Sequence, residues 1–214
     1  MKSQQEGVVK YQSNHTQGAA ADRSTVEDLI VWRQIFYQLG LIGQNPNLYG
    51  GAGYGNVSQK IGVNDQGQPV FWITGTQTGG LETIAPESFS RVDSYDVDQN
   101  QLSCMGPIAA SSEAMTHGAV YEADPDAMFV LHTHSKTIWS AYQKLNLQFT
   151  PEDVEYGTAE MARSVKQLSR DPKWTQDRAF VMLGHEDGVF TFGATAESAG
   201  LAMVKILTQA MKTI

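Results

Sequence analysis

The sequence contains a single cysteine, Cys104, among its 214 residues. One cysteine excludes an intrachain disulfide and any metal site built from several thiolates. Long apolar runs are also missing: no stretch reaches the roughly 18 apolar residues of a membrane-spanning helix, so we expect no membrane association. The N-terminus lacks the apolar segment of a secretory signal. These absences lead us to expect a cytoplasmic protein.

Basic residues are few, and they are scattered along the chain. There are 15 Lys and Arg residues against 23 Asp and Glu residues, which gives a formal net charge of −8. Because no basic stripe is present, we expect no nucleic-acid partner. A hydrophobic content of 41% argues against disorder, and the length suits one hydrophobic core.

The sequence predicts a polar N-terminal segment followed by one domain. Residues 1–22 show neither a helical nor a strand period, and we expect a tail or an arm that packs on a neighbouring chain. Residues 23–214 form the domain. Its first helix is predicted between a capping pattern at Ser24 and a stop at Gly40. The apolar face of this helix is expected to carry Leu29, Trp32, Phe36 and Leu39.

Strand-like and helix-like segments are mixed along the domain, which predicts a sheet covered by helices. A helix is expected after Ser111 and Ser112, with a serine as N-cap and an end at Asp124. Further helices are expected to begin at Thr158 and Thr195. Strands are expected in the segments NVSQKI, PVFWITG, FVLHTH, AFVML and GVFTF.

The apolar segment FVL at residues 129–131 runs directly into His132 and His134. In a strand these two side chains point to the same face, where two neutral imidazoles can share one metal ion. Other His-x-His metal folds fit poorly. A cupin would have a glutamate soon after the second histidine, a metallo-β-lactamase would have Asp where Lys136 stands, and a (β/α)8 hydrolase needs about 250 residues.

Glu113 lies in the first turn of the helix that follows Ser111 and Ser112, 19 residues before His132 (132 − 113). A helix start with two hydroxyl groups can bind an anion, although ordinary capping explains the same residues. His117 lies one helical turn after Glu113, so the two could form a separate metal pair. We favour a structural, hydrogen-bonding function for His117.

Five motifs in order resemble the class II aldolase/adducin family over about residues 24 to 210. They are GNVS, ITGT, SSE, HTH and GHEDGVFTFG. The family includes fuculose- and rhamnulose-phosphate aldolases, a ribulose-phosphate 4-epimerase, a dehydratase and the metal-free heads of adducins. The resemblance implies an α/β fold, a three-layer α/β/α sandwich around a mixed, mostly antiparallel sheet. It also implies a homotetramer.

The resemblance also implies site residues. His132, His134 and His185 match the ligands of one Zn²⁺ per chain, and Glu113 matches the catalytic acid/base. Four residues match positions that bind the substrate's phosphate, namely Asn56, Thr76, Ser111 and Ser112. The implied function is that of a fuculose-phosphate aldolase-like, zinc-dependent lyase acting through an enediolate on a small sugar or sugar-acid phosphate. The alternatives are a dehydratase or decarboxylase of the same family, and a non-catalytic adducin-like interaction module.

The chain departs from the family pattern at several points. Glu186 and Asp187 follow His185, where the family has glycine, and could add an acidic residue to the rim of the site. Gln77 stands where the aldolases have glycine in the phosphate loop. Aldolases also use a tyrosine from a neighbouring subunit, for which Tyr156 is a candidate.

Overall fold

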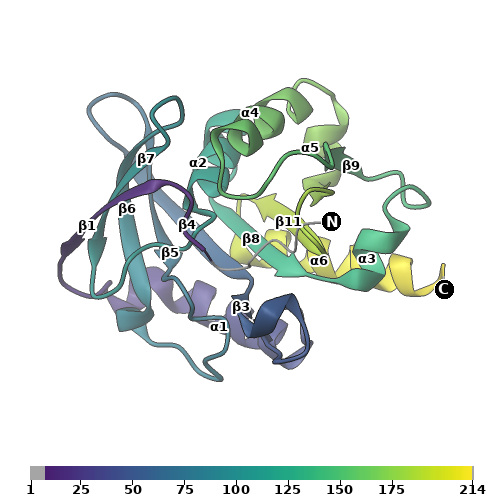
Figure 1. The fold of residues 1–214 in the computed structure, drawn as a ribbon, viewed down its shortest axis with the longest axis horizontal. Coiled ribbons are helices and arrows are strands. Elements are labelled where there is room, and N and C mark those ends of the chain that lie inside the picture. The colour runs from purple at the N-terminus through teal and green to yellow at the C-terminus, as the bar shows by residue number, and fades with distance from the viewer. Residues whose placement is uncertain (1–7, 214) are drawn as a thin grey trace.

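Nine strands form one sheet in residues 8–213, the part of the chain that the computed structural model describes (Figure 1). Their order is β1-β7-β6-β5-β4-β8-β11-β10-β9. The strands are β1 (Gln12–Gln17), β4 (Asn56–Val63), β5 (Pro69–Thr74), β6 (Phe89–Asp96), β7 (Gln101–Gly106), β8 (Phe129–His134), β9 (Gln148–Thr150), β10 (Ala179–Met182) and β11 (Gly188–Gly193). β2 (Gly43–Gln44) and β3 (Gly53–Tyr54) form a separate small sheet.

The pairing confirms the predicted mixed, mostly antiparallel sheet. Only the pairs β1–β7 and β9–β10, at the two edges of the described sheet, are parallel. The neighbouring strands between these edge pairs run antiparallel. β8 therefore lies in the interior of the sheet, flanked by β4 and β11.

Helices cover both faces of the sheet, as predicted for a three-layer fold (Figure 1). One face carries α2 (Ala114–Ala123), α4 (Ala159–Leu168) and α5 (Lys173–Asp177). The other carries α1 (Arg23–Gln38), α3 (Lys136–Ala141) and α6 (Ala196–Met211). Two short 3-10 helices, η1 (Tyr49–Gly51) and η2 (Pro86–Ser88), lie in connections. No helix in residues 8–213 is long and apolar enough to cross a membrane.

β8 sends alternate side chains to the two faces, as a strand must. Val130 packs in the core beneath α2, whereas Phe129 and Leu131 pack in the core of the opposite face. Thr133 continues on that opposite face, where its hydroxyl donates to Met203 Sδ of α6. His132 therefore lies on the α2 face, stacked on Phe190 with ring centroids 4.6 Å apart.

The start of α1 differs from the prediction. The helix begins at Arg23 and its N-cap, Asp22, makes no side-chain capping bond, so the expected cap at Ser24 is wrong. The buried residues are Val26, Leu29, Arg33 and Phe36. Leu39 lies beyond the helix and is half-exposed. The predicted stop is confirmed, since Gly40 follows with a positive φ of 70° that favours glycine.

The starts of the other predicted helices are mostly confirmed. Thr158 accepts a bond from Met161 N, and Thr195 accepts one from Ser198 N. α2 ends at Asp124 as predicted. Its N-cap, however, is Glu113 rather than a serine, and no side chain caps the helix. This correction leaves the Glu113 carboxylate available for other contacts.

Residues 12–17 form a strand within the segment that was expected to be a tail. β1 pairs in parallel with β7, from Gln12 opposite Gln101 to Gln17 opposite Gly106. All six residues of β1 are exposed, so an edge strand of this kind carries no apolar alternation that the sequence could reveal. These six residues are therefore a strand of the sheet rather than part of a tail. Residues 1–7 of the expected tail lie outside the described residues.

Candidate metal centre

Strand β8 and the turn between β10 and β11 bring three histidines together. His132 and His134 lie on one face of β8, and Gly188 of β11 pairs opposite His134. The turn that precedes Gly188 therefore places His185 beside both rings. Ring centroids are 5.0 Å apart for His132 and His134, 5.1 Å for His132 and His185, and 4.7 Å for His134 and His185. The three residues predicted to bind metal thus form one cluster.

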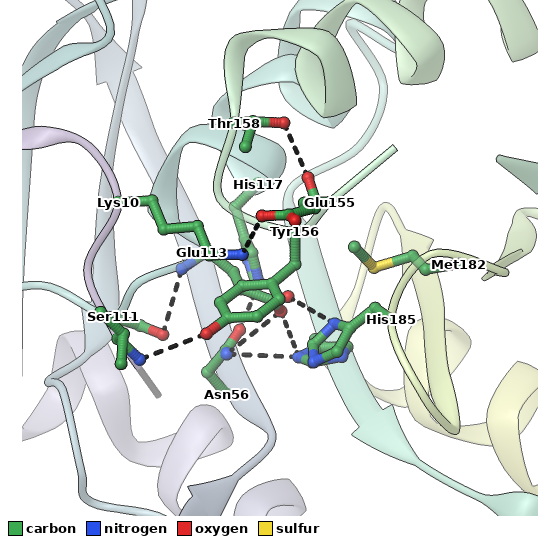
Figure 2. Close-up of polar contacts among 12 residues, drawn as sticks. Lys10, Asn56, Ser111, Glu113, His117, Glu155, Tyr156, Thr158, Met182 and His185 are labelled. Atoms are coloured by element: carbon green, nitrogen blue, oxygen red, sulfur yellow. Dashed lines mark hydrogen bonds and ion pairs between the residues drawn. The ribbon is translucent and has the colours of Figure 1, made fainter. Parts of the chain in front are cut away.

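Glu113 reaches this cluster from the N-terminal end of α2 (Figure 2). Its Oε1 lies 2.9 Å from His185 Nδ1, and its Oε2 forms an ion pair with His132 Nδ1. All four side chains are almost fully buried. A buried carboxylate is costly unless charged or polar partners compensate it. The two imidazoles supply that compensation here.

The charges in the cluster depend on one another. Burial by itself would raise the pKa of Glu113, but His132 and His185 reverse this effect and hold that pKa well below its usual range. Burial lowers the pKa of His134 far below its usual value, and the neighbouring His185 and His132 add to this shift. Glu113 is therefore ionised and His134 is neutral, the form in which imidazole binds a metal.

The donor set fits a divalent metal ion. Each of the three histidines offers one nitrogen ligand atom, and these three atoms lie within 4.8 Å of one another. His132 Nε2 is buried and has no hydrogen-bond partner among the described residues, which is unusual unless an ion or water binds there. Three imidazole nitrogens are a donor set that suits Zn²⁺.

His117 takes part in a hydrogen-bond network rather than in the metal cluster. Its Nδ1 lies 2.6 Å from Ser58 Oγ and its Nε2 lies 2.6 Å from Asn56 Oδ1. The Asn56 amide nitrogen in turn lies 3.5 Å from Glu113 Oε2. Burial is the main cause that lowers the pKa of His117 to about 3. The geometry agrees with the structural function that we favoured.

A small polar pocket adjoins the cluster at Asn56. It is lined by all four residues that we predicted to bind phosphate, Asn56, Thr76, Ser111 and Ser112. Two backbone bonds join the loops that carry them: Thr76 N donates to Ala109 O at 2.9 Å, and Ser111 N donates to Thr74 O at 3.2 Å. The structure therefore brings these residues together, and their binding function remains a prediction.

Arg33 supports the loop on which Thr76 lies, and sequence reasoning missed it. The residue is 1% exposed, and its guanidinium donates to the carbonyl oxygens of Thr78 at 2.9 Å, Gly79 at 2.8 Å and Glu82 at 3.1 Å. Burial lowers the pKa of Arg33, but an arginine stays charged under these conditions. A signal was present, because Arg33 occupies the helical position between the buried Leu29 and Phe36.

The departures from the family pattern have clear positions. Asp187 is buried, adopts a φ of 63° and accepts a 2.6 Å hydrogen bond from the Tyr49 hydroxyl. The Tyr49 ring contacts His134 edge-on at 4.6 Å between centroids, a neighbour that sequence reasoning missed. Glu186 is exposed. Gln77 adopts a φ of 59°, so it occupies the conformation that suits the glycine of the aldolases.

Comparison with known families identifies the chain. The model of the Class II Aldolase and Adducin N-terminal domain family matches residues 48–212, most of the chain. The protein belongs to this class II aldolase/adducin family. The match includes each of the three clustered histidines and Glu113. A comparison with curated proteins found no significant match.

Solved structures of class II aldolases share the fold. L-fuculose-1-phosphate aldolase from Thermus thermophilus is 18% identical, with a TM-score of 0.63 over 90% of this chain and 93% of that chain. A sugar-phosphate aldolase from Thermotoga maritima is 16% identical, with a TM-score of 0.65 over 89% and 93%. YgbL from Escherichia coli, named for aldolase, epimerase or decarboxylase activity, is 20% identical, with a TM-score of 0.62 over 88% and 87%. At these identities the likeness concerns the fold alone.

Proposed function

We propose that this protein is a zinc-dependent lyase that cleaves or forms a bond next to a carbonyl group of a small sugar or sugar-acid phosphate. One observation carries the proposal: three buried histidines and a buried carboxylate meet beside a polar pocket. Aldol cleavage is our first choice. The names of two similar structures, a fuculose-phosphate and a sugar-phosphate aldolase, agree with such a substrate.

The metal ligands and the pocket have separate tasks in this proposal. His132, His134 and His185 would hold Zn²⁺, which when bound polarises the carbonyl group next to the reacting bond. Thr76, Ser111 and other polar groups of the pocket would hold the phosphate through hydroxyl and backbone donors. Binding the phosphate orients the substrate, so that its reacting carbons lie at the histidine cluster.

Glu113 would move the proton. Aldol cleavage removes a proton from the hydroxyl group of the carbon that becomes the aldehyde, and the carbon that is left behind later gains one. Glu113 is ionised and can accept a proton on a carboxylate oxygen. Its contacts with both His132 and His185 support this role.

Two alternatives follow from specific observations. The name of YgbL includes epimerase and decarboxylase activity, and dehydration or decarboxylation would use the same histidines and carboxylate. An adducin-like interaction module without chemistry is the other alternative. The buried histidines and the carboxylate count against it, because an interaction module gains nothing from burying such costly groups.

An activity screen tests the proposal. Zinc-loaded protein is incubated with ketose phosphates and sugar-acid phosphates, and aldehyde, carbon dioxide and dehydrated products are measured separately. We expect one substrate class to give an aldehyde, with activity lost on chelation and restored by zinc. A protein that holds zinc but converts no member of the panel would favour the interaction module. Dehydrated products or carbon dioxide would redirect the assignment within the family.

A further inference from the structure

Tyr156 covers one side of the metal centre. Its ring stacks on His185 with centroids 4.5 Å apart and an interplanar angle of 25°, and its side chain is fully buried. Figure 2 shows the ring next to the His185 imidazole, on the side from which the N-terminal segment approaches. Tyr156 lies in the connection between β9 and α4, outside any helix or strand. A residue in such a connection needs other contacts to fix its position.

Residues 8–10 provide these contacts. Val8 N donates to the Tyr156 hydroxyl at 3.3 Å. Lys10 Nζ lies 3.9 Å from the centroid of the Tyr156 ring and forms a 2.9 Å ion pair with the adjacent Glu155 (Figure 2). A lysine over an aromatic face is attracted by the ring. The N-terminal segment thus holds both the ring and the loop that carries it.

The same segment reaches the polar pocket. The hydroxyl of the buried Tyr11 donates to the carbonyl oxygen of Ser111 at 2.9 Å. Gly157, next to Tyr156, has a φ of 67°, and a Cβ at this position would lie 2.8 Å from Ser112 O. The loop that carries the ring and the serine loop are therefore in direct contact. Both are joined to residues 8–11.

The sheet anchors this segment. Asn100 Nδ2 donates to Lys10 O at 2.9 Å, and Gln12 N donates to Asn100 O at 2.8 Å. β1 then continues along β7. β1 holds one end of the segment in the sheet. The sheet therefore determines where residues 8–11 contact Tyr156 and Ser111.

We propose that residues 8–11, here called the N-terminal clamp, are positioning residues for the metal centre. The clamp holds Tyr156 against His185 and holds Ser111 in the wall of the pocket. The family match begins at residue 48, so the clamp lies outside it. The inference rests on the proposed zinc site. Its consequence is that zinc affinity depends on a segment that contributes no metal ligand.

Zinc affinity measures this dependence without any substrate. Competition with a chromogenic chelator gives the affinity, and the visible spectrum of the cobalt-substituted protein reports the ligand geometry. We expect Tyr156→Leu to weaken zinc binding roughly 3- to 10-fold, the range given by loss of an aromatic pair. Tyr156→Phe keeps the ring and loses only the bond from Val8 N, so it should weaken zinc binding by less than Tyr156→Leu does. Lys10→Met should weaken binding roughly 2- to 5-fold, and Lys10→Arg should restore it.

Two control variants separate positioning from a general loss of stability. Phe71→Leu also removes a buried aromatic ring, in a part of the core that has no ring contact with the three histidines. Lys166→Met removes a lysine that pairs with Glu122 on the surface. Neither should change zinc affinity or the cobalt spectrum.

The outcomes distinguish the inference from the function on which it rests. An unmodified protein that binds no zinc overturns both. Suppose that the unmodified protein binds zinc. If Tyr156→Leu and Lys10→Met then bind zinc as tightly as the unmodified protein, the clamp is overturned and the proposed function still stands. The Lys10 variants alter a partly exposed side chain. They therefore keep the test decisive even if Tyr156→Leu fails to fold.

Discussion

Replacing Glu113 by glutamine tests whether this one side chain both supports the histidines and transfers the proton. The carboxylate contacts His132 Nδ1 through one oxygen and His185 Nδ1 through the other. Glutamine keeps the shape, but it has only one oxygen, and its NH₂ group would face the second ring nitrogen. An amide NH₂ group cannot accept a hydrogen bond from that ring nitrogen. The variant therefore loses one charge-assisted contact.

The expected size of the effect follows from the contact that the variant loses. Loss of one contact to a charged group costs about 1.5 to 3 kcal/mol, which corresponds to roughly 10- to 100-fold weaker zinc binding. At saturating zinc, turnover should fall a further 10² to 10⁴-fold, approximately the contribution of a positioned acid/base. A purely structural function of Glu113 would predict a loss of stability and no change in turnover.

The assay measures zinc affinity, unfolding and turnover on the same preparations. Glu122→Gln is a matched control, because Glu122 lies on α2, the helix that Glu113 precedes, and pairs with Lys166 at the surface. It should leave all three quantities close to their original values. Turnover that is unchanged in Glu113→Gln at saturating zinc would remove Glu113 from the mechanism. Complete loss of zinc at any concentration would instead make Glu113 a ligand.

Three further predictions concern the pocket, the pH dependence and the assembly. Arg33→Met leaves buried carbonyl oxygens without donors, so the free energy of unfolding in urea should fall by about 2 to 4 kcal/mol. Inhibition by inorganic phosphate should weaken roughly tenfold in the same variant. The control Arg163→Met, at an exposed site, should change neither quantity. Burial lowers the pKa of His117 to about 3 in the folded protein, whereas the pKa in the unfolded chain is about 6.5. Between these two pH values the unfolded chain binds more protons than the folded protein, so stability should fall on acidification from about pH 6.5 to about pH 3. His117→Gln should flatten this slope, and an unchanged slope would exclude His117 as its source. Light scattering should report about four chains per particle, and an active monomer would contradict the tetramer.

The positions of His132 and His134 could be predicted from the sequence because the signals for them are local. The alternation of Val130, Leu131 and His132 requires only strand geometry, and the two imidazoles then share a face. Threonine caps at Thr158 and Thr195 are similarly local, since each bond spans three residues. The third histidine is different. Its place followed from the family resemblance, and the register between β8 and β11 explains it physically.

Contacts between distant segments carried no comparable signal. The exposed strand β1 has no apolar pattern, because an edge strand with both faces in water gains nothing from one. Lys10 and Tyr156 are 146 positions apart (156 − 10), and nothing in either sequence neighbourhood shows that they meet. Arg33 left a trace as a charged residue within a buried helical stripe. Its hydrogen bonds to the loop that follows Thr76, however, depend on tertiary packing.

The metal content of the unmodified protein and of His134→Ala decides whether the three histidines bind one zinc ion. His15→Ala is the control, because His15 lies on β1 and its ring contacts Gly106 O. We expect about one zinc ion per chain in the unmodified protein and in His15→Ala. We expect almost none in a folded His134→Ala, because all three imidazoles are needed to hold the ion. Full zinc occupancy in His134→Ala, or no zinc in the unmodified protein, would contradict this expectation.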